Sequence, residues 1–202
     1  MRLGVLGGTF DPIHVAHLVL AEEARRCLVL ERVVFVPAGD PWRKAGQRIT
    51  AGEHRLAMVR LAVADNPFFE VSTVELERRG PSYTADTLEE LRRERGPGTE
   101  LYFIVGEDAL EDLPHWKDPG RIIAQAYVAV APRGSWEASD VEAVERAVPG
   151  ISRKLVTFDM PRMEISATAL RARAAAGESL RYLVPAPVEE YIRRHRLYVT
   201  PD

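Results

Sequence analysis

Two histidines close to the start of the chain, His14 and His17, carry the side chains best suited to chemistry. They follow a short apolar run, Leu3 to Leu6, and a turn with two consecutive glycines, Gly7 and Gly8. Glycines let backbone N–H groups approach an anion closely, and the first turn of a helix attracts negative charge. Residues three apart share one face of a helix, so both imidazoles can point at one bound group. This pattern of strand, turn and helix predicts a nucleotide-binding site with chemistry at its edge.

Strands that alternate with helices would position this histidine pair. Short runs of β-branched and other apolar residues recur along the chain, and amphipathic segments lie between them. Such alternation favours an α/β fold, a Rossmann-like doubly wound parallel sheet that helices cover on both faces. The expected strands are Leu3–Leu6, Val33–Val36, Phe69–Val74, Leu101–Val105, Tyr127–Ala131 and Leu155–Phe158.

Local end signals predict the helices between these strands. The first helix is expected to run to about Leu30, with Cys27 on its apolar side facing the core. Thr50-Ala-Gly-Glu53 has the form of a capping box that opens a helix, and Ser139-Asp-Val-Glu142 is expected to cap another. A further helix is expected from about Thr84 to Arg95.

Length and composition bound the domain organisation. The chain has 202 residues, 46% of them hydrophobic, which suffices for one sizeable core and one domain over residues 1–202. Residues 1–160 form the expected Rossmann-like core. Residues 161–202 are expected to form a small helical C-terminal subdomain, with a helix over Thr168–Ala176 opened by Ser166 and another over Pro187–His195.

Charge and composition argue against several classes of partner. The formal net charge is −3, so no global basic field attracts nucleic acid, and a small substrate is favoured. The single cysteine cannot form an internal disulfide. No apolar run reaches about 18 residues, and the first residues lack the form of a signal peptide, so we expect a cytoplasmic protein without membrane contact. The sequence leaves the oligomeric state open, a homo-oligomer included.

The topology of such a sheet predicts where a ligand binds. Ligands lie beyond the carboxyl ends of the strands where the winding direction changes, typically between the first and fourth strands. Here Gly7 to His17 follow one of these ends, and Gly106 to Asp108 follow the other. Asp108 can hold a ribose hydroxyl or simply cap a helix, and both interpretations stay open. Arg133, after the fifth strand, can reach a phosphate or lie on a surface loop, which also stays open.

Two stretches far apart in the chain resemble the signatures of one nucleotidyltransferase superfamily. Residues 7–14 followed by His17 are similar to its HxGH-type turn, and Ile165–Arg171 are similar to its ISSTxxR signature. The motifs come in the same order as in that superfamily and span nearly the whole chain, so together they are more specific than any one alone. Three further stretches resemble the nicotinate-nucleotide adenylyltransferases within it, namely Ser82–Leu88, Gly106–Leu110 and Trp116.

The resemblance implies transfer of the adenylyl group of ATP to the 5′-phosphate of nicotinate mononucleotide, with Mg²⁺ as cofactor and pyrophosphate as the leaving group. The catalytic residues would be His14, His17 and Arg171. The ATP-binding residues would be Gly7, Gly8, Thr9, Phe10, His14, His17, Gly106, Ser166, Thr168 and Arg171, with Arg133 added if it reaches a phosphate. The residues that bind the acceptor would be Lys44, Tyr83, Thr84, Asp108, Trp116 and Lys117.

Three positions depart from the family pattern. Ala16 stands where the turn usually has glycine, and its methyl group crowds the turn slightly but leaves both histidines in place. Ala167 replaces a serine of the second signature and removes one hydroxyl that could bind phosphate. Arg43 precedes Lys44 at a position where the family often has histidine.

Other functions compete with this interpretation. Nicotinamide mononucleotide or phosphopantetheine as acceptor would keep the reaction, although Ser82–Leu88 and Trp116 argue against phosphopantetheine. A dinucleotide-dependent oxidoreductase needs GxGxxG and an acidic residue after the second strand, which here ends at Pro37. A nucleotide-sensing module would not need both His14 and His17. These two histidines could also be half of a zinc site, but no further ligand falls at suitable spacing, so no metal site is predicted.

Overall fold

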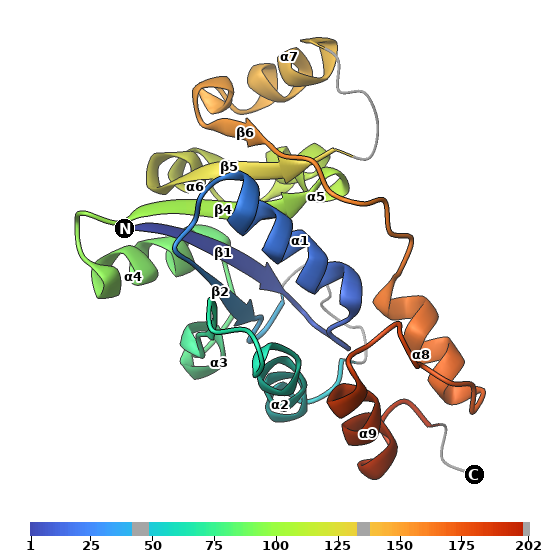
Figure 1. The fold of residues 1–202 in the computed structure, drawn as a ribbon. Coiled ribbons are helices and arrows are strands. Elements are labelled where there is room, and N and C mark those ends of the chain that lie inside the picture. The colour runs from blue at the N-terminus through green and yellow to red at the C-terminus, as the bar shows by residue number, and fades with distance from the viewer. Residues whose placement is uncertain (42–48, 133–137, 200–202) are drawn as a thin grey trace.

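A parallel sheet forms the centre of the molecule (Figure 1). The computed structural model describes residues 1–41, 49–132 and 138–199, and within them six strands lie in the order β3-β2-β1-β4-β5-β6, with every neighbouring pair parallel. The winding reverses between β1 and β4, which confirms the predicted doubly wound α/β fold. The strands are β1 (Arg2–Gly8), β2 (Arg32–Pro37), β3 (Phe69–Val71), β4 (Glu100–Gly106), β5 (Ala126–Ala131) and β6 (Leu155–Thr157).

The carboxyl ends of the central strands are level with one another. In the register of β1 and β2, Gly8 lies opposite Pro37, and in that of β4 and β5, Gly106 lies opposite Ala131. The loops that follow these strands therefore leave the sheet along one edge. Both segments that the sequence predicts for the site begin at this edge.

Helices cover both faces of the sheet, and each face buries its own apolar cluster (Figure 1). Phe35 of β2 lies in the first cluster with Met58 and Val188, and Phe103 of β4 lies in the second with Leu88. The first cluster is covered by α1 (Val15–Cys27), α2 (Gly52–Val63), α8 (Ala167–Ala175) and α9 (Ala186–Arg194). The second is covered by α3 (Val74–Glu77), α4 (Thr84–Arg95), α5 (Glu107–Glu111), η2 (Leu113–His115), α6 (Pro119–Gln125), α7 (Ala138–Ala147) and η3 (Ile151–Arg153).

The ends of several elements differ from the sequence prediction. Helix α4 has the predicted bounds, but α1 ends before Leu30 because Val29 adopts a positive φ of 52° that turns the chain. Cys27, the last residue of α1, is exposed, so its predicted place in the core is wrong. Strand β3 stops at Val71, and residues 74–77 form α3 instead of a strand end and loop.

The two predicted capping boxes do not start their helices. Helix α2 begins at Gly52, one residue late, and the Thr50 N–H donates instead to Asp11 Oδ2 (3.1 Å). Helix α7 begins at Ala138, so Ser139 lies inside it. The sequence also predicts no helix between residues 107 and 125, where α5, η2 and α6 occur. Tertiary contacts therefore override the local start signal at α2.

Helices α8 and α9 lie within one residue of their predicted bounds at each end. Leu170 of α8 and Val188 of α9 both join the first apolar cluster. The division into a core and a helical subdomain at residue 160 stays a prediction. Among the helices of the described residues, none combines the length and the apolar character needed to span a membrane.

A buried arginine on α2 ties the strand ends together. The Arg55 side chain, only 2% exposed, donates from Nη1 to the Thr9 carbonyl (2.8 Å) and from Nε to the Thr50 carbonyl (2.8 Å). Its Nη2 donates more weakly to the Gly39 carbonyl (3.4 Å). Burial lowers the pKa of Arg55, and the charge of Asp11 opposes this shift. Arg55 thus holds the segments that follow β1 and β2 in fixed positions.

Replacing Arg55 by methionine should lower the free energy of unfolding by about 3 kcal/mol, because the buried carbonyls lose their donor. Urea denaturation measures this difference. Arg60→Met is the matched control, since Arg60 lies exposed on the same helix, and its effect should stay within about 0.5 kcal/mol. Equal effects of the two substitutions would contradict the role given to Arg55.

Candidate active site

A cleft of about 780 Å³ opens at the carboxyl edge of the sheet. His14 and His17 line it at the start of α1, Gly106 at the end of β4, and Ser166 directly before α8. Four residues predicted to bind ATP, from distant parts of the chain, therefore lie around one cleft. The remaining lining residues are Ala16, Leu20, Ala131, Pro132, Met160, Pro161, Arg162, Met163, Glu164 and Ile165.

The two histidines form a stacked pair. Their ring centroids lie 3.7 Å apart with the planes at 27°. His17 Nδ1 accepts a hydrogen bond from the His14 backbone N–H (3.2 Å), so a neutral His17 ring carries its proton on Nε2. The His14 side chain is 6% exposed, and burial lowers the pKa of this imidazole to about 4. The pair is thus fixed in orientation, and His14 is neutral at neutral pH.

One nitrogen of this pair, His14 Nδ1, lies inside the protein. His14 Nδ1 is buried, and no group among the described residues forms a hydrogen bond with it. Buried polar atoms in folded proteins nearly always have a partner, which is supplied by protein, water or ligand. In the first turn of α1 the His17 backbone N–H faces the His14 side chain without the geometry of a full hydrogen bond.

Phe10 supports the histidines from the core. Its ring is 2% exposed and packs against His17 edge to face, with the centroids 5.1 Å apart. A Cβ atom on Gly8 would lie 2.9 Å from the Phe10 ring, so this close approach requires glycine. The Phe10 ring is buried in the core, so the predicted contact of Phe10 with ATP stays a prediction that its backbone can meet.

The loop before His14 is held by Asp11, a buried carboxylate with 3% exposure. Asp11 Oδ1 accepts a hydrogen bond from the Tyr198 hydroxyl (2.7 Å), and its carbonyl accepts one from Arg171 Nη1 (2.8 Å). Burial and the bond to Asp11 raise the pKa of Tyr198. The sequence analysis missed both Asp11 and Tyr198. The available signal was that Asp11 lies inside the first signature.

The second signature meets the first through Arg171. Its Nη2 donates to Thr168 Oγ1 (3.2 Å), while its Nη1 reaches the loop of Asp11. Ser166 accepts from the Ala169 N–H (3.2 Å) and caps α8, as the sequence predicts. Met160 to Ile165 line the cleft although the sequence analysis did not select them, and their position directly before Ser166 was the available signal.

Trp116 and the start of α4, both predicted to bind the acceptor, lie on the second face of the sheet. Trp116 packs edge to face on Phe103, with the centroids 5.8 Å apart, and its Nε1 donates to Asp112 Oδ2 (2.9 Å). Tyr83 occupies the cap position of α4, which begins at Thr84. These three residues are not among the described residues that line the 780 Å³ cleft.

Of four further predicted residues, two are exposed and two lie outside the described part of the chain. Asp108 is exposed in the first turn of α5, where Gly106 is the cap, so the alternative of Asp108 as the cap is wrong. Lys117 is exposed just after η2. Lys44 and Arg133 lie outside the described residues.

Comparison with known proteins identifies the family. Residues 5–173 match the family model described as cytidylyltransferase-like. A relative from Roseiflexus sp. (strain RS-1) is 48% identical over 197 residues, 97% of both chains. One from Thermomicrobium roseum is 47% identical over 201 residues, 100% of this chain and 93% of its own. Both carry the name "Probable nicotinate-nucleotide adenylyltransferase". The chain belongs to the nicotinate-nucleotide adenylyltransferase family.

Solved structures agree on the fold of this adenylyltransferase. A Plasmodium falciparum nicotinic acid mononucleotide adenylyltransferase complexed with NaAD superimposes with a TM-score of 0.76 at 19% identity, covering 98% of this chain and 97% of its own. The same protein complexed with APC gives a TM-score of 0.75 at 18% identity. The predicted family is thus confirmed, and the chain is an enzyme, a nucleotidyltransferase, rather than an oxidoreductase.

The low pKa of His14 predicts a pH dependence of stability. Between the ordinary value of 6.5 and about 4, the unfolded chain binds a proton that the folded chain does not bind. The free energy of unfolding should therefore fall by up to about 3 kcal/mol as the pH decreases through this range. Urea denaturation at a series of pH values measures the fall. His14→Asn should reduce it by a similar amount, and an unchanged fall in this variant would contradict the assignment.

Proposed function

We propose that the chain transfers the adenylyl group of ATP to the 5′-phosphate of nicotinate mononucleotide, which gives nicotinate adenine dinucleotide and pyrophosphate. The observation that carries this proposal is the stacked pair of His14 and His17 beside Ser166 in one cleft. The membership of the adenylyltransferase family supports it. The names of the relatives favour nicotinate mononucleotide over the other acceptors considered.

The reaction needs alignment more than acid–base chemistry. The attacking group is an anionic phosphate, so no general base is required, and catalysis depends on holding the reactants and stabilising charge at the α-phosphorus. His17 Nε2–H and the neutral His14 ring would donate hydrogen bonds to the triphosphate. Arg171 would balance the charge of the leaving pyrophosphate.

The backbone and hydroxyl groups around this centre would hold the rest of ATP. The turn of Gly7, Gly8 and Thr9 would present N–H groups to phosphate, as would the first turns of α1 and α8. Ser166 and Thr168 would bind the β- and γ-phosphates. Phe10 would contact ATP through its backbone, because its ring is buried. Gly106 and Arg133 would also contact ATP.

Magnesium is proposed as a part of the substrate. Among the described residues, no group of three or more His, Cys, Asp or Glu side chains could hold a metal ion. Mg²⁺ commonly binds through substrate phosphates with few protein ligands, so it would enter as MgATP. Bound in this way, it would neutralise part of the phosphate charge. The chain's own contribution remains the placement of those phosphates.

The acceptor half would recognise a pyridine ring and its carboxylate. Trp116 would stack on the ring, and Tyr83, Thr84 and the backbone near Lys117 would receive the carboxylate. Hydrogen bonds to a charged group contribute roughly 1.5–3 kcal/mol each, so two of them discriminate acid from amide by about a hundredfold or more. We propose that Asp108 binds a ribose hydroxyl and that Lys44 binds the acceptor. A cytoplasmic location, the absence of nucleic-acid binding and the oligomeric state stay predictions.

Pyrophosphate release with ATP and Mg²⁺ tests the reaction directly. Turnover should be dominated by nicotinate mononucleotide, with kcat/KM about a hundredfold above that for nicotinamide mononucleotide. The His17→Ala variant should lose about 10²–10³ in kcat, the effect of removing one donor to transition-state charge. Equal turnover of nicotinamide mononucleotide would refute the proposed binding of the carboxylate by Tyr83, Thr84 and the backbone near Lys117. Turnover of phosphopantetheine alone would identify a different acceptor, and a folded protein that binds ATP without turnover would indicate a sensing module.

The stacking role of Trp116 gives a separate prediction. Trp116→Ala should raise KM for nicotinate mononucleotide about tenfold, because an aromatic pair contributes about 0.5–1.5 kcal/mol beyond burial, while KM for ATP stays near its original value. Steady-state kinetics with each substrate varied in turn measures both constants. Trp116→Phe is the control that keeps an aromatic plane. Equal losses for the two substrates in Trp116→Ala would refute the stacking role.

A further inference from the structure

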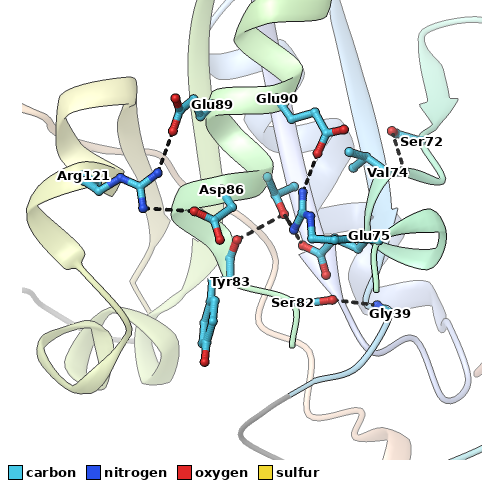
Figure 2. A network of polar contacts seen from close by, with 12 residues as sticks. Gly39, Ser72, Val74, Glu75, Ser82, Tyr83, Asp86, Glu89, Glu90 and Arg121 are labelled. Atoms are coloured by element: carbon cyan, nitrogen blue, oxygen red, sulfur yellow. Dashed lines mark hydrogen bonds and ion pairs between the residues drawn. The ribbon is translucent and has the colours of Figure 1, made fainter. Parts of the chain in front are cut away.

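A second buried carboxylate, Glu75 of α3, lies away from the histidine cleft and is 7% exposed. The Thr87 hydroxyl donates to Glu75 Oε1 at 2.7 Å. Ser82 also forms a side-chain hydrogen bond with this carboxylate. Figure 2 shows Glu75 beside Ser82 and Gly39, with the Tyr83 ring directed away from this network. The carboxylate therefore joins residues of α3 and α4 in the interior of the protein.

The Ser82 hydroxyl is held in place by two backbone N–H groups. Its oxygen accepts hydrogen bonds from the Gly39 N–H (3.1 Å) and the Asp40 N–H (3.2 Å). A hydroxyl oxygen has two lone pairs and one proton, so Ser82 can accept both backbone bonds and still donate to Glu75. The residue before Tyr83 is thereby fixed to the end of β2 and to α3 at once.

Thr87 is held in a similar way. Its oxygen accepts from Arg78 Nη1 (3.1 Å) while its proton goes to Glu75. Arg78 Nη2 in turn donates to Glu90 (2.6 Å). Burial raises the pKa of Glu75, and its hydrogen bonds with Thr87 and Ser82 oppose this shift. The Glu75 carboxylate thus accepts hydrogen bonds from two hydroxyls, that of Ser82 just before α4 and that of Thr87 after its first turn.

The backbone around Glu75 leaves no room for adjustment. A Cβ atom on Gly39 would lie 2.0 Å from the Glu75 carbonyl oxygen, so α3 rests directly on the end of β2. Ser82 N–H donates to the Asp40 carbonyl (2.9 Å), which closes the same contact from the side of α4. The position of Tyr83 and Thr84 is therefore set by this three-way junction.

We propose that Glu75 is a positioning residue for acceptor specificity: through Ser82 and Thr87 it fixes Tyr83 and Thr84 where they receive the acceptor's carboxylate. Glu75 itself contacts no substrate. The inference rests on the proposed function, because it assigns a cause to the preference for the acid over the amide. Glu75 is not among the described residues that line the histidine cleft, so ATP binding is expected to change little when Glu75 is replaced.

The test compares Glu75→Gln and Thr87→Val with the unchanged enzyme. An amide offers one accepting oxygen where the carboxylate offers two, and valine keeps the shape of threonine without its hydroxyl. In both variants the ratio of kcat/KM for nicotinate mononucleotide to that for nicotinamide mononucleotide should fall about tenfold, the effect of one hydrogen bond to a charged group. KM for ATP should change less than about twofold.

Glu90→Gln is the matched control, since Glu90 binds the same Arg78 but neither Ser82 nor Thr87. Glu90→Gln should leave the ratio of the two kcat/KM values unchanged. The ratio does not depend on the amount of folded enzyme. A merely structural role of Glu75 would therefore lower both rates and leave the ratio unchanged. An unchanged ratio would overturn the inference. If Glu75→Gln fails to fold, Thr87→Val decides. An unchanged enzyme without turnover of nicotinate mononucleotide would instead refute the proposed function itself.

Discussion

The guanidinium of Arg55 is the interaction on which both halves of the site depend. Carbonyl groups just beyond the ends of parallel strands have no partner in the sheet, and a planar donor with several N–H groups can satisfy more than one of them. Arg55 does this for Thr9 and Gly39. Thr9 leads into the loop that carries His14, and Gly39 carries the contact with Glu75 and Ser82. A single buried side chain thus sets the distance between the segments that follow β1 and β2.

The two faces of the sheet carry different groups of the predicted site residues. The face with α1 and α8 holds the histidines, Ser166 and Arg171, while the opposite face holds Trp116 and the start of α4. Transfer of an adenylyl group between two bound nucleotides requires reacting atoms to be aligned across the edge of the sheet. The level strand ends supply that alignment, because both loops begin from a rigid parallel ladder.

The sequence predicted features that are encoded locally. Strands appeared as apolar runs, the Ser166 cap as a single polar residue before a helix, and the histidine pair as a spacing of three. The residues that were missed act over long separations: Arg55 meets Thr9 46 positions away, and Tyr198 meets Asp11 187 positions away. Cys27 was misjudged for a related reason, since burial depends on what packs against a residue. No local pattern contains that information.

The two apolar clusters have a consequence for how this enzyme can change. Substitutions that lie far apart and share no partner usually have additive effects. A residue exchanged beside Trp116 or α4 repacks only against the second cluster, so the nucleotide-binding loop keeps its geometry. If Trp116 and α4 bind the acceptor as proposed, the choice of acceptor can be redesigned with little effect on the proposed phosphate-binding residues. The exception is the junction at Gly39, where the two clusters of contacts meet and where a side chain would collide with the Glu75 carbonyl oxygen.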